Sequence, residues 1–254
     1  MAQETRSGLS EAQARIVYNA QNQPGSNAAI ARQSDGTWTV TWSPQPAGAA
    51  PAPAAAGSVA KLTQADIDTA ARALGPGVSA AIVRAFAEVE SGGKSGFGAD
   101  GRPVIAYEGH TFRKLTGAKY DASFPLLSYP YKVKAGPEWQ QNNKTQDTAW
   151  ATLAKAMALD AGAAQQACSW GMFQVMGFNY RTCGYATVDA FVAAMRAGEA
   201  GQLQAFVGFC KAQRGMVEAM VGKDFKMMAT IYNGADYGDY DKRIERAYKK
   251  YGGS

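Results

Sequence analysis

The sequence predicts an α+β protein that is mainly α-helical, with one small β-hairpin in a large domain and a small α/β module ahead of it. From residue 60 onward, apolar side chains recur at intervals of three and four, which is the spacing of amphipathic helices. Two Asp-Gly pairs, at 35–36 and 100–101, are typical of tight turns between β-strands. Residues 44–58 are rich in Pro, Ala and Gly, carry no charge and lack large apolar side chains, so they are predicted to be a linker.

The small module covers residues 1–43. A helix is predicted over residues 9–22, and a strand is predicted at 38–42 because tryptophan and valine alternate there with threonine. A module of about 40 residues is smaller than most chains that fold alone. It is therefore expected to dock on the large domain or to bind a partner through Trp38 and Trp42.

The large domain, residues 59–254, opens with two predicted helices. The first begins at a capping box formed by Thr63 and Asp66 and ends before Gly75, and the second runs over 78–90. A hairpin is expected to follow, in which the Asp-Gly turn at 100–101 leads into a strand within 103–112. Further elements are predicted from the same spacing: helices near 146–161, 187–197, 201–221, 223–233 and 239–250, and irregular structure over the proline-containing 116–144.

Composition and charge exclude several classes of function. The chain has 26 Lys and Arg against 21 Asp and Glu, and this net charge of +5 favours an anionic partner without specifying which. His110 is the one histidine, so a two-histidine zinc site cannot form, and no metal or cofactor is expected. The three cysteines contain no C-x-x-C pair and are expected to be buried free thiols. No nucleic-acid recognition motif is present, and a nucleic-acid partner is not expected.

Two glutamates end the second predicted helix, and they have different expected roles. Glu88 lies four residues after Arg84, which is the spacing of a surface ion pair. Glu90 lies about 200° around the helix from Glu88, near the apolar face of Phe86. Burial and the negative end of the helix dipole both raise the pKa of a carboxyl group. A carboxyl group that is still protonated near neutral pH is what general-acid cleavage of a glycosidic bond requires.

Two later segments carry polar side chains on apolar elements. Residues 169–176 are apolar apart from Ser169 and Gln174, which favours a buried helix that presents an amide to a cleft. An amide both donates and accepts hydrogen bonds, so it suits sugar hydroxyl and N-acetyl groups, although a core helix with a satisfied glutamine is equally compatible. Tyr232 and Asn233 end an apolar helix at a glycine stop, which taken alone is an ordinary helix end.

The order of these segments resembles the motif series of lysozyme-like muramidases, including goose-type lysozymes and family-1 lytic transglycosylases. The series reads E-S-G at 90–92, S-W-G-M-F-Q-V-M at 169–176 and A-T-I-Y-N-G at 229–234. The sequences G-F at 96–97, D-G-R-P at 100–103 and Y-E-G-H at 107–110 are similar to a narrower group, the phage endolysin N-acetylmuramidase family. The resemblance covers roughly residues 60–252 and implies a lysozyme-like catalytic domain.

The resemblance assigns roles residue by residue. It implies that Glu90 is the catalytic acid and that Ser169, Gln174, Tyr232 and Asn233 line the saccharide site. Glu108, which follows 18 residues after Glu90, is the best candidate for a second catalytic carboxylate. Asp100 is the runner-up, but turn chemistry already explains an aspartate before Gly101. His110 is expected to form structural hydrogen bonds beside the sheet.

The resemblance implies an enzyme that cleaves the β-1,4 bond between N-acetylmuramic acid and N-acetylglucosamine in peptidoglycan, acts without a cofactor and is a monomer. A lytic transglycosylase, which forms anhydro-muramic ends, stays open, as does a non-catalytic cell-wall-binding protein. The non-catalytic alternative would keep a degenerate lysozyme fold. The module at 1–43 lies outside the resemblance, and endolysins of this kind often carry a small peptidoglycan-binding module there, so it is a candidate wall-binding part. A cysteine hydrolase would need Cys168 beside His110, and no motif around Cys168 supports it.

Two further expectations concern the cellular setting. The basic helix at 239–250 has an apolar side, and it is expected either to dock with a solvated charged face or to contact the outer membrane transiently. Because no signal peptide is recognisable, the protein is expected to be made in the host cytoplasm. The endolysin resemblance implies that it then reaches periplasmic peptidoglycan through a membrane pore.

Overall fold

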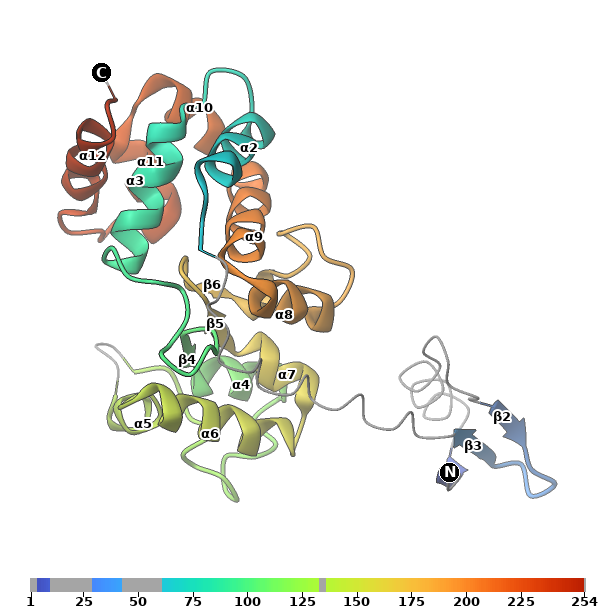
Figure 1. The fold of residues 1–254 in the computed structure, drawn as a ribbon. Helices are drawn as coiled ribbons and strands as arrows, with labels where there is room; N and C mark the ends of the chain where they lie inside the picture. Colours follow the sequence, from blue (N-terminus) through green and yellow to red (C-terminus); the bar gives the residue numbers. More distant parts are fainter. Residues whose placement is uncertain (1–3, 10–28, 43–60, 133–135, 254) are drawn as a thin grey trace. The chain divides into compact units, whose positions relative to one another are not determined.

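A computed structural model describes residues 4–9, 29–42, 61–132 and 136–253. The chain divides into two compact units, Met1–Ala55 and Ala56–Ser254. The larger unit is mainly helical with a small antiparallel sheet, as predicted (Figure 1). Within the described residues, no helix is long and apolar enough to cross a membrane.

The first unit contains a three-stranded antiparallel sheet in the order β1-β3-β2. Its strands are β1 (Glu4–Leu9), β2 (Ala29–Arg32) and β3 (Trp38–Trp42). The turn at Asp35 and Gly36 is confirmed, because β2 and β3 pair across it and the Thr37 N–H donates to Asp35 Oδ1 at 2.9 Å. The predicted helix at 9–22 is wrong at Leu9, which pairs with Trp38 as the last residue of β1, and the rest of it lies outside the described residues.

In the second unit, the sheet β4-β5-β6 lies between two groups of helices (Figure 1). Helices α4 to α7 lie on one side of it, and α2, α3 and α9 to α12 lie on the other. The sheet contains β4 (Ile105–Tyr107), β5 (Cys168–Trp170) and β6 (Val175–Met176). The helices are α2 (Gln64–Leu74), α3 (Ala80–Ser91), α4 (Gly109–Leu115), α5 (Pro137–Asn142), α6 (Gln146–Met157), α7 (Ala161–Gln166), η1 (Gly177–Asn179), α8 (Val188–Ala197), α9 (Glu199–Ala212), α10 (Met216–Gly222), α11 (Phe225–Asn233) and α12 (Tyr240–Lys250).

Helix α2 begins with the predicted capping box. The Thr63 hydroxyl accepts from the Asp66 N–H, and the Asp66 carboxylate accepts from the Thr63 N–H. Helix α3 follows after the break at Gly75, and it is capped at its C-terminus by Gly92 in the left-handed conformation, with φ +61°. Its apolar stripe is fully buried at Ile82 and Phe86.

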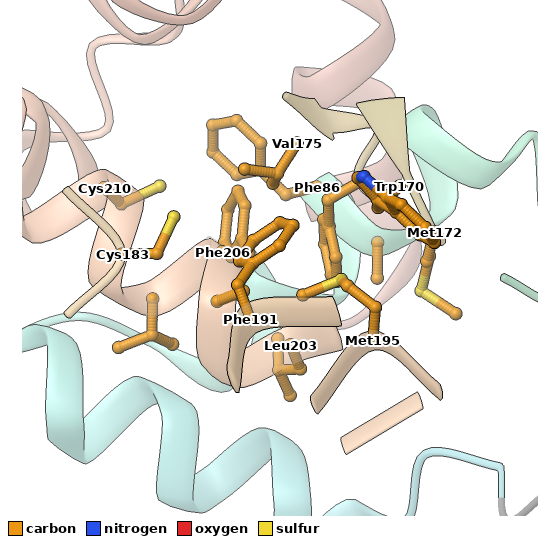
Figure 2. Close-up of a cluster of buried hydrophobic side chains, with 14 of the residues drawn as sticks. Phe86, Trp170, Met172, Val175, Cys183, Phe191, Met195, Leu203, Phe206 and Cys210 are labelled. Atoms are coloured by element: carbon orange, nitrogen blue, oxygen red, sulfur yellow. The ribbon is translucent and has the colours of Figure 1, made fainter. Parts of the chain in front are cut away.

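The core of this unit joins α3 to α8, α9 and the β5–β6 hairpin (Figure 2). Phe206 on α9 stacks on Phe173 with 4.4 Å between ring centroids, and Phe86 of α3 packs against Phe206 at 5.3 Å. Cys168, Cys183 and Cys210 are buried free thiols, as expected. The end of α3 and the hairpin are therefore held by one set of packed aromatic side chains.

Several predicted elements differ from the structure. The helix predicted near 146–161 ends at Met157, and a separate helix, α7, starts at Ala161. The predicted helix at 201–221 is interrupted before Gly215, whose φ of +82° is incompatible with a continuous helix. The segment 116–144, expected to be irregular, contains α5, which starts with Pro137 in the first turn, where the missing N–H costs nothing. The strand expected within 103–112 ends at Tyr107 and pairs with β5 rather than back across the Asp100 turn, where a single bridge joins Phe97 and Pro103.

The predicted helix at 169–176 is also wrong, because this segment forms the β5–β6 hairpin. Gly171 and Gln174 both have positive φ, +70° and +46°, so the chain reverses direction within four residues. The pairing of β5 with β4 outweighs the local apolar pattern, which does not distinguish a short buried strand from a short buried helix.

The outer edge of β4 is covered by two side-chain amides. The Tyr107 N–H donates to Asn143 Oδ1 at 2.7 Å, and Asn143 Nδ2 donates back to the Tyr107 carbonyl at 3.0 Å. Gln146 makes the same pair of bonds with the backbone of Ile105. These amides act as a substitute strand, so the edge has no unpaired backbone groups at these two residues.

Candidate active site

Glu90 lies in the last turn of α3, at the end of that helix nearest the sheet (Figure 1). Its neighbour Val89 is buried, and its carboxyl group accepts a short hydrogen bond from the hydroxyl of Tyr240, the first residue of α12. The guanidinium of Arg243, one turn further along α12, donates to the Val89 carbonyl at 3.0 Å. The packing of α12 against α3 therefore supplies the polar neighbours of Glu90.

The pKa of Glu90 is raised from 4.5 to about 7. Burial is the main cause, because it removes water from the charged form. The Tyr240 hydroxyl and the positive charge of Arg243 act in the opposite direction and favour the carboxylate. Glu90 is thus a carboxyl group that can hold its proton near neutral pH and release it there, as the sequence predicted.

Tyr232 and Asn233, at the end of α11, lie next to this glutamate. The Tyr232 ring stacks on the Tyr240 ring with 6.1 Å between centroids and 5° between planes, and its hydroxyl donates to the Phe173 carbonyl at 3.1 Å. Asn233 is exposed and its side chain hydrogen-bonds to Tyr240. The structure therefore brings both predicted residues to the Tyr240 side of Glu90, with Tyr232 as a half-buried support and Asn233 accessible to a ligand.

Ser169 and Gln174 lie on the β5–β6 hairpin and bind each other. The Ser169 hydroxyl donates to Gln174 Oε1 at 2.7 Å, and Gln174 Nε2 donates to the Gly171 carbonyl at 2.8 Å. Ser169 is buried, whereas Gln174 is half-buried. In this structure the Gln174 amide stabilises the turn that it belongs to, so the expectation of an amide presented from a helix is corrected.

Gln202, a fully buried residue of α9, fixes the position of this hairpin. Its Oε1 accepts from the Met172 N–H at 2.7 Å, and its Nε2 donates to the carbonyls of Gly96 and Met195 at 3.3 and 3.1 Å. One side chain thus ties the hairpin turn to the loop that follows α3. The space around Gln202 excludes a side chain at Gly96, because a Cβ there would lie 1.9 Å from Gln202 Oε1.

Glu108 follows β4 directly and precedes α4, so it lies at a strand–helix junction and not within the strand that was expected. The indole N–H of Trp139 donates to Glu108 Oε1 at 2.8 Å, and His110 Nδ1 lies 3.4 Å from Oε2. Burial raises the pKa of Glu108, and the Trp139 and His110 contacts oppose that rise. The His110 ring also meets the exposed Tyr131 edge-on at 5.1 Å between centroids.

The two candidate carboxyl groups have separate environments. Tyr240 and Arg243, both on α12, act on Glu90. Trp139 and His110 act on Glu108, which follows the sheet strand β4. The hairpin links them, since β5 pairs with β4 and Phe173 contacts Tyr232. This arrangement offers one acid with a near-neutral pKa and a second carboxyl group that can accept a proton.

Other predicted residues have structural roles. Glu88 does not pair with Arg84; it binds Lys250 Nζ at 2.7 Å and the Tyr251 hydroxyl at 2.5 Å, because α12 lies close enough to compete for it. Asp100 accepts from the Arg102 N–H within its turn, as turn chemistry predicts.

Burial holds the pKa of the Cys168 thiol well above its usual range, which makes it a poor nucleophile. Among the described residues, no cluster of His, Cys, Asp and Glu could hold a metal ion.

Sequence reasoning missed three functional neighbours: Tyr240, Trp139 and Gln202. Tyr240 falls within the helix predicted at 239–250, where its apolar spacing explains its burial but not its contact with Glu90. Trp139 lies 31 residues from Glu108 in a segment expected to be irregular. These contacts join residues far apart in the chain, so local spacing carries no signal for them.

Comparisons with known proteins identify the family of this chain. The family model for N-acetylmuramidase matches residues 79–252. Among solved structures, the crystal structure of Burkholderia AP3 phage endolysin is similar at 40% sequence identity and a TM-score of 0.66, over 76% of this chain and 71% of that one. No curated protein matches the chain. The matched residues make up more than half of the chain and include both Glu90 and Glu108. The chain belongs to the N-acetylmuramidase family and is a glycoside hydrolase of the muramidase type.

Proposed function

We propose that this protein is a phage endolysin that hydrolyses the β-1,4 bond between N-acetylmuramic acid and N-acetylglucosamine in peptidoglycan, with Glu90 as general acid. The observation that carries the assignment is the half-buried carboxyl group of Glu90 at the end of α3, bound by the Tyr240 hydroxyl and with its pKa raised to about 7. Family membership and the similarity to Burkholderia AP3 phage endolysin support the substrate class.

In this mechanism, Glu90 donates its proton to the glycosidic oxygen as the bond to the anomeric carbon of N-acetylmuramic acid breaks. The leaving N-acetylglucosamine keeps that oxygen as a hydroxyl group, and positive charge develops on the sugar ring. Glu108 is proposed to accept a proton from the water that attacks the anomeric carbon. Burial raises the pKa of Glu108, and its contacts with Trp139 and His110 limit that rise in favour of the ionised form that a base needs.

The other site residues are proposed to position the sugar. Asn233 is exposed beside Tyr240, where an amide can bind a hydroxyl or N-acetyl group. Tyr232 is proposed to act through Tyr240, on which it stacks. Ser169 and Gln174 are proposed to form the wall of the site through the shape of their hairpin.

The alternative reaction is that of a lytic transglycosylase, in which the 6-hydroxyl group of N-acetylmuramic acid replaces water. Mass spectrometry of fragments from purified peptidoglycan separates the two reactions. Fragments that end in reducing N-acetylmuramic acid support the hydrolase, and anhydro-muramic ends would replace it with the transglycosylase. Loss of fragment release in Glu90→Gln is expected in both cases, whereas an unaffected variant would contradict the role of Glu90.

The cellular setting is part of the same proposal: a monomer that binds no nucleic acid, is made in the host cytoplasm and reaches periplasmic peptidoglycan through a membrane pore. A transient outer-membrane contact by α12 would use charge, because its apolar residues Ile244, Ala247 and Tyr248 are buried. Lysis of intact cells should then fall with rising salt more steeply than cleavage of purified peptidoglycan.

A further inference from the structure

A cavity of about 580 Å³ opens between the C-terminal end of α3 and the exposed face of α12. Its wall on α12 carries three cations, Arg243, Arg246 and Lys250, and its one carboxylate is Glu88. We call this cavity the basic pocket. Glu88 is already bound by Lys250 and by the Tyr251 hydroxyl, so it does not pair with either arginine of the pocket.

The pocket adjoins the catalytic end of α3. Val89, Gly92 and Gly93 line it, and they flank Glu90 in the chain. Arg243 belongs to both places, since it lines the pocket, donates to the Val89 carbonyl and lowers the pKa of Glu90. A Cβ placed on Gly92 or Gly93 would have no heavy atom within 4 Å, so no side chain covers the backbone on this side of the pocket.

Arg246 is the cation most available to a ligand. The carboxylate that it pairs with, Asp239, is 4.0 Å away, and both side chains are about two-thirds exposed. Such a pair is weak and screened by water, so a bound anion can replace it at little cost. By contrast, Lys250 is held at 2.7 Å by Glu88.

We propose that the basic pocket binds carboxylate groups of the peptidoglycan strand while Glu90 acts on the glycosidic bond. This inference rests on the proposed function for the identity of the polymer. N-Acetylmuramic acid carries a lactyl group, from which the peptide stem extends with its own free carboxylates. A pocket beside the general acid can therefore receive the substituent of the sugar whose bond is cleaved, and its volume exceeds what a single carboxylate needs.

Binding measurements in the full-length Glu90→Gln chain test the pocket without turnover. Isothermal titration calorimetry would compare three soluble ligands: uncross-linked peptidoglycan strands with stems, the same strands after an amidase has removed the stems, and chito-oligosaccharides, which carry no carboxylate. The variants are Arg246→Gln and Arg246→Glu. Lys242→Gln is the matched control, because Lys242 is exposed on the same helix but does not line the pocket.

For strands with stems, Kd is expected to rise about threefold in Arg246→Gln and about tenfold in Arg246→Glu at low salt. Affinity for chito-oligosaccharides should not change, and Lys242→Gln should resemble the parent chain on every ligand. An effect confined to strands with stems assigns the peptide carboxylates. An effect that persists after their removal shows that the pocket also binds the lactyl carboxylate, which the amidase frees by cleaving its amide bond to the stem. Three results would overturn the proposal. Arg246→Gln could raise Kd no more than Lys242→Gln does, it could raise Kd for the neutral oligosaccharide as much as for strands with stems, or it could leave every Kd unchanged.

A separate assay, release of glycan fragments by the chain with Glu90 intact, tests the proposed function independently of the basic pocket. If that chain releases no glycan fragments, the proposed function fails, while the comparison of Kd values still decides whether the pocket binds carboxylates. Thermal unfolding of each variant should coincide with that of the parent chain, because Arg246 is exposed and makes only a weak ion pair.

Discussion

At the residue scale, the proton on Glu90 is controlled by opposing groups. Burial favours the protonated form, whereas the Tyr240 hydroxyl and the Arg243 charge favour the carboxylate. Burial dominates, and the result is a pKa of about 7. The sequence predicted the direction of this shift from the apolar neighbours of Glu90, but it did not predict the two groups that limit it.

Replacing Tyr240 with Phe should move the alkaline limb of the pH–activity profile upward. The change removes the hydroxyl that stabilises the Glu90 carboxylate, so the acid keeps its proton to higher pH, by about one pH unit for a hydrogen bond to a charged group. The measurement is kcat/KM for soluble peptidoglycan strands between pH 5 and 9. Tyr120→Phe is the control, since the Tyr120 hydroxyl donates to the Leu159 carbonyl. A limb that moves downward would contradict the assigned donor.

Glu90→Gln should stabilise the fold while it abolishes cleavage. The folded-state pKa of about 7 lies above the ordinary value of 4.5, so the wild-type chain loses stability as pH rises from about 4.5 to 7 and reaches its full penalty above pH 7. The gain in the free energy of unfolding for Gln is expected to be on the order of 3 kcal/mol at pH 8 and small at pH 4. Denaturant titrations at both pH values measure it, and a gain that does not depend on pH would refute burial of the charged carboxylate as its cause.

At the scale of elements, the β5–β6 hairpin connects the two carboxyl groups. Its apolar sequence was predicted to be a helix, and the pattern alone could not exclude one. Two sets of contacts favour the hairpin over a helix: the pairing of β5 with β4 and the hydrogen bond from the Met172 N–H to the buried Gln202. They supply hydrogen-bond partners for backbone groups that would otherwise bond to one another within a helix. Those partners come from distant parts of the chain.

Gly96→Ala is expected to displace this hairpin. A Cβ at residue 96 would lie 1.9 Å from Gln202 Oε1 and 2.6 Å from the Met172 nitrogen, so Gln202 must move and leave buried polar groups unpaired. The expected cost is about 3 kcal/mol in the free energy of unfolding, with a fall in kcat. Gly162→Ala is the matched control, because its nearest contact would be at 3.8 Å within α7 and it should stabilise by about 0.5–1 kcal/mol. Equal stability of the two variants would argue against the role of Gln202.

The long helices of the large unit follow from the sequence more directly than the hairpin does. Thr63 and Asp66 form the predicted cap, and α3, α8, α11 and α12 lie within about two residues of their predicted ranges. Apolar spacing acts within one or two turns of each helix, and side-chain caps begin α3, α8 and α11, so local residues determine the outcome.

At the scale of the whole molecule, the chain contains two compact units, and both candidate carboxyl groups lie in Ala56–Ser254. A chain shortened to residues 56–254 is expected to keep its kcat on soluble peptidoglycan strands within about twofold. If residues 1–43 bind the wall, the shortened chain should also cosediment less with insoluble peptidoglycan. Activity assays and cosedimentation of both chains test this. A shortened chain that is folded but inactive would contradict the claim that residues 56–254 are sufficient for catalysis.

The sequence by itself determined the mainly helical class, the family resemblance and the choice of Glu90, because helix spacing, capping and ordered motifs are local properties of the chain. The tertiary structure alone decided which groups set the proton affinity of Glu90, since Tyr240 lies 150 residues away and reaches it only through the packing of α12 on α3. It also decided that Glu108 binds Trp139 and that Glu88 pairs with Lys250 instead of Arg84. The pKa of a carboxyl group depends on what surrounds it in space, and those surroundings form only when the chain folds.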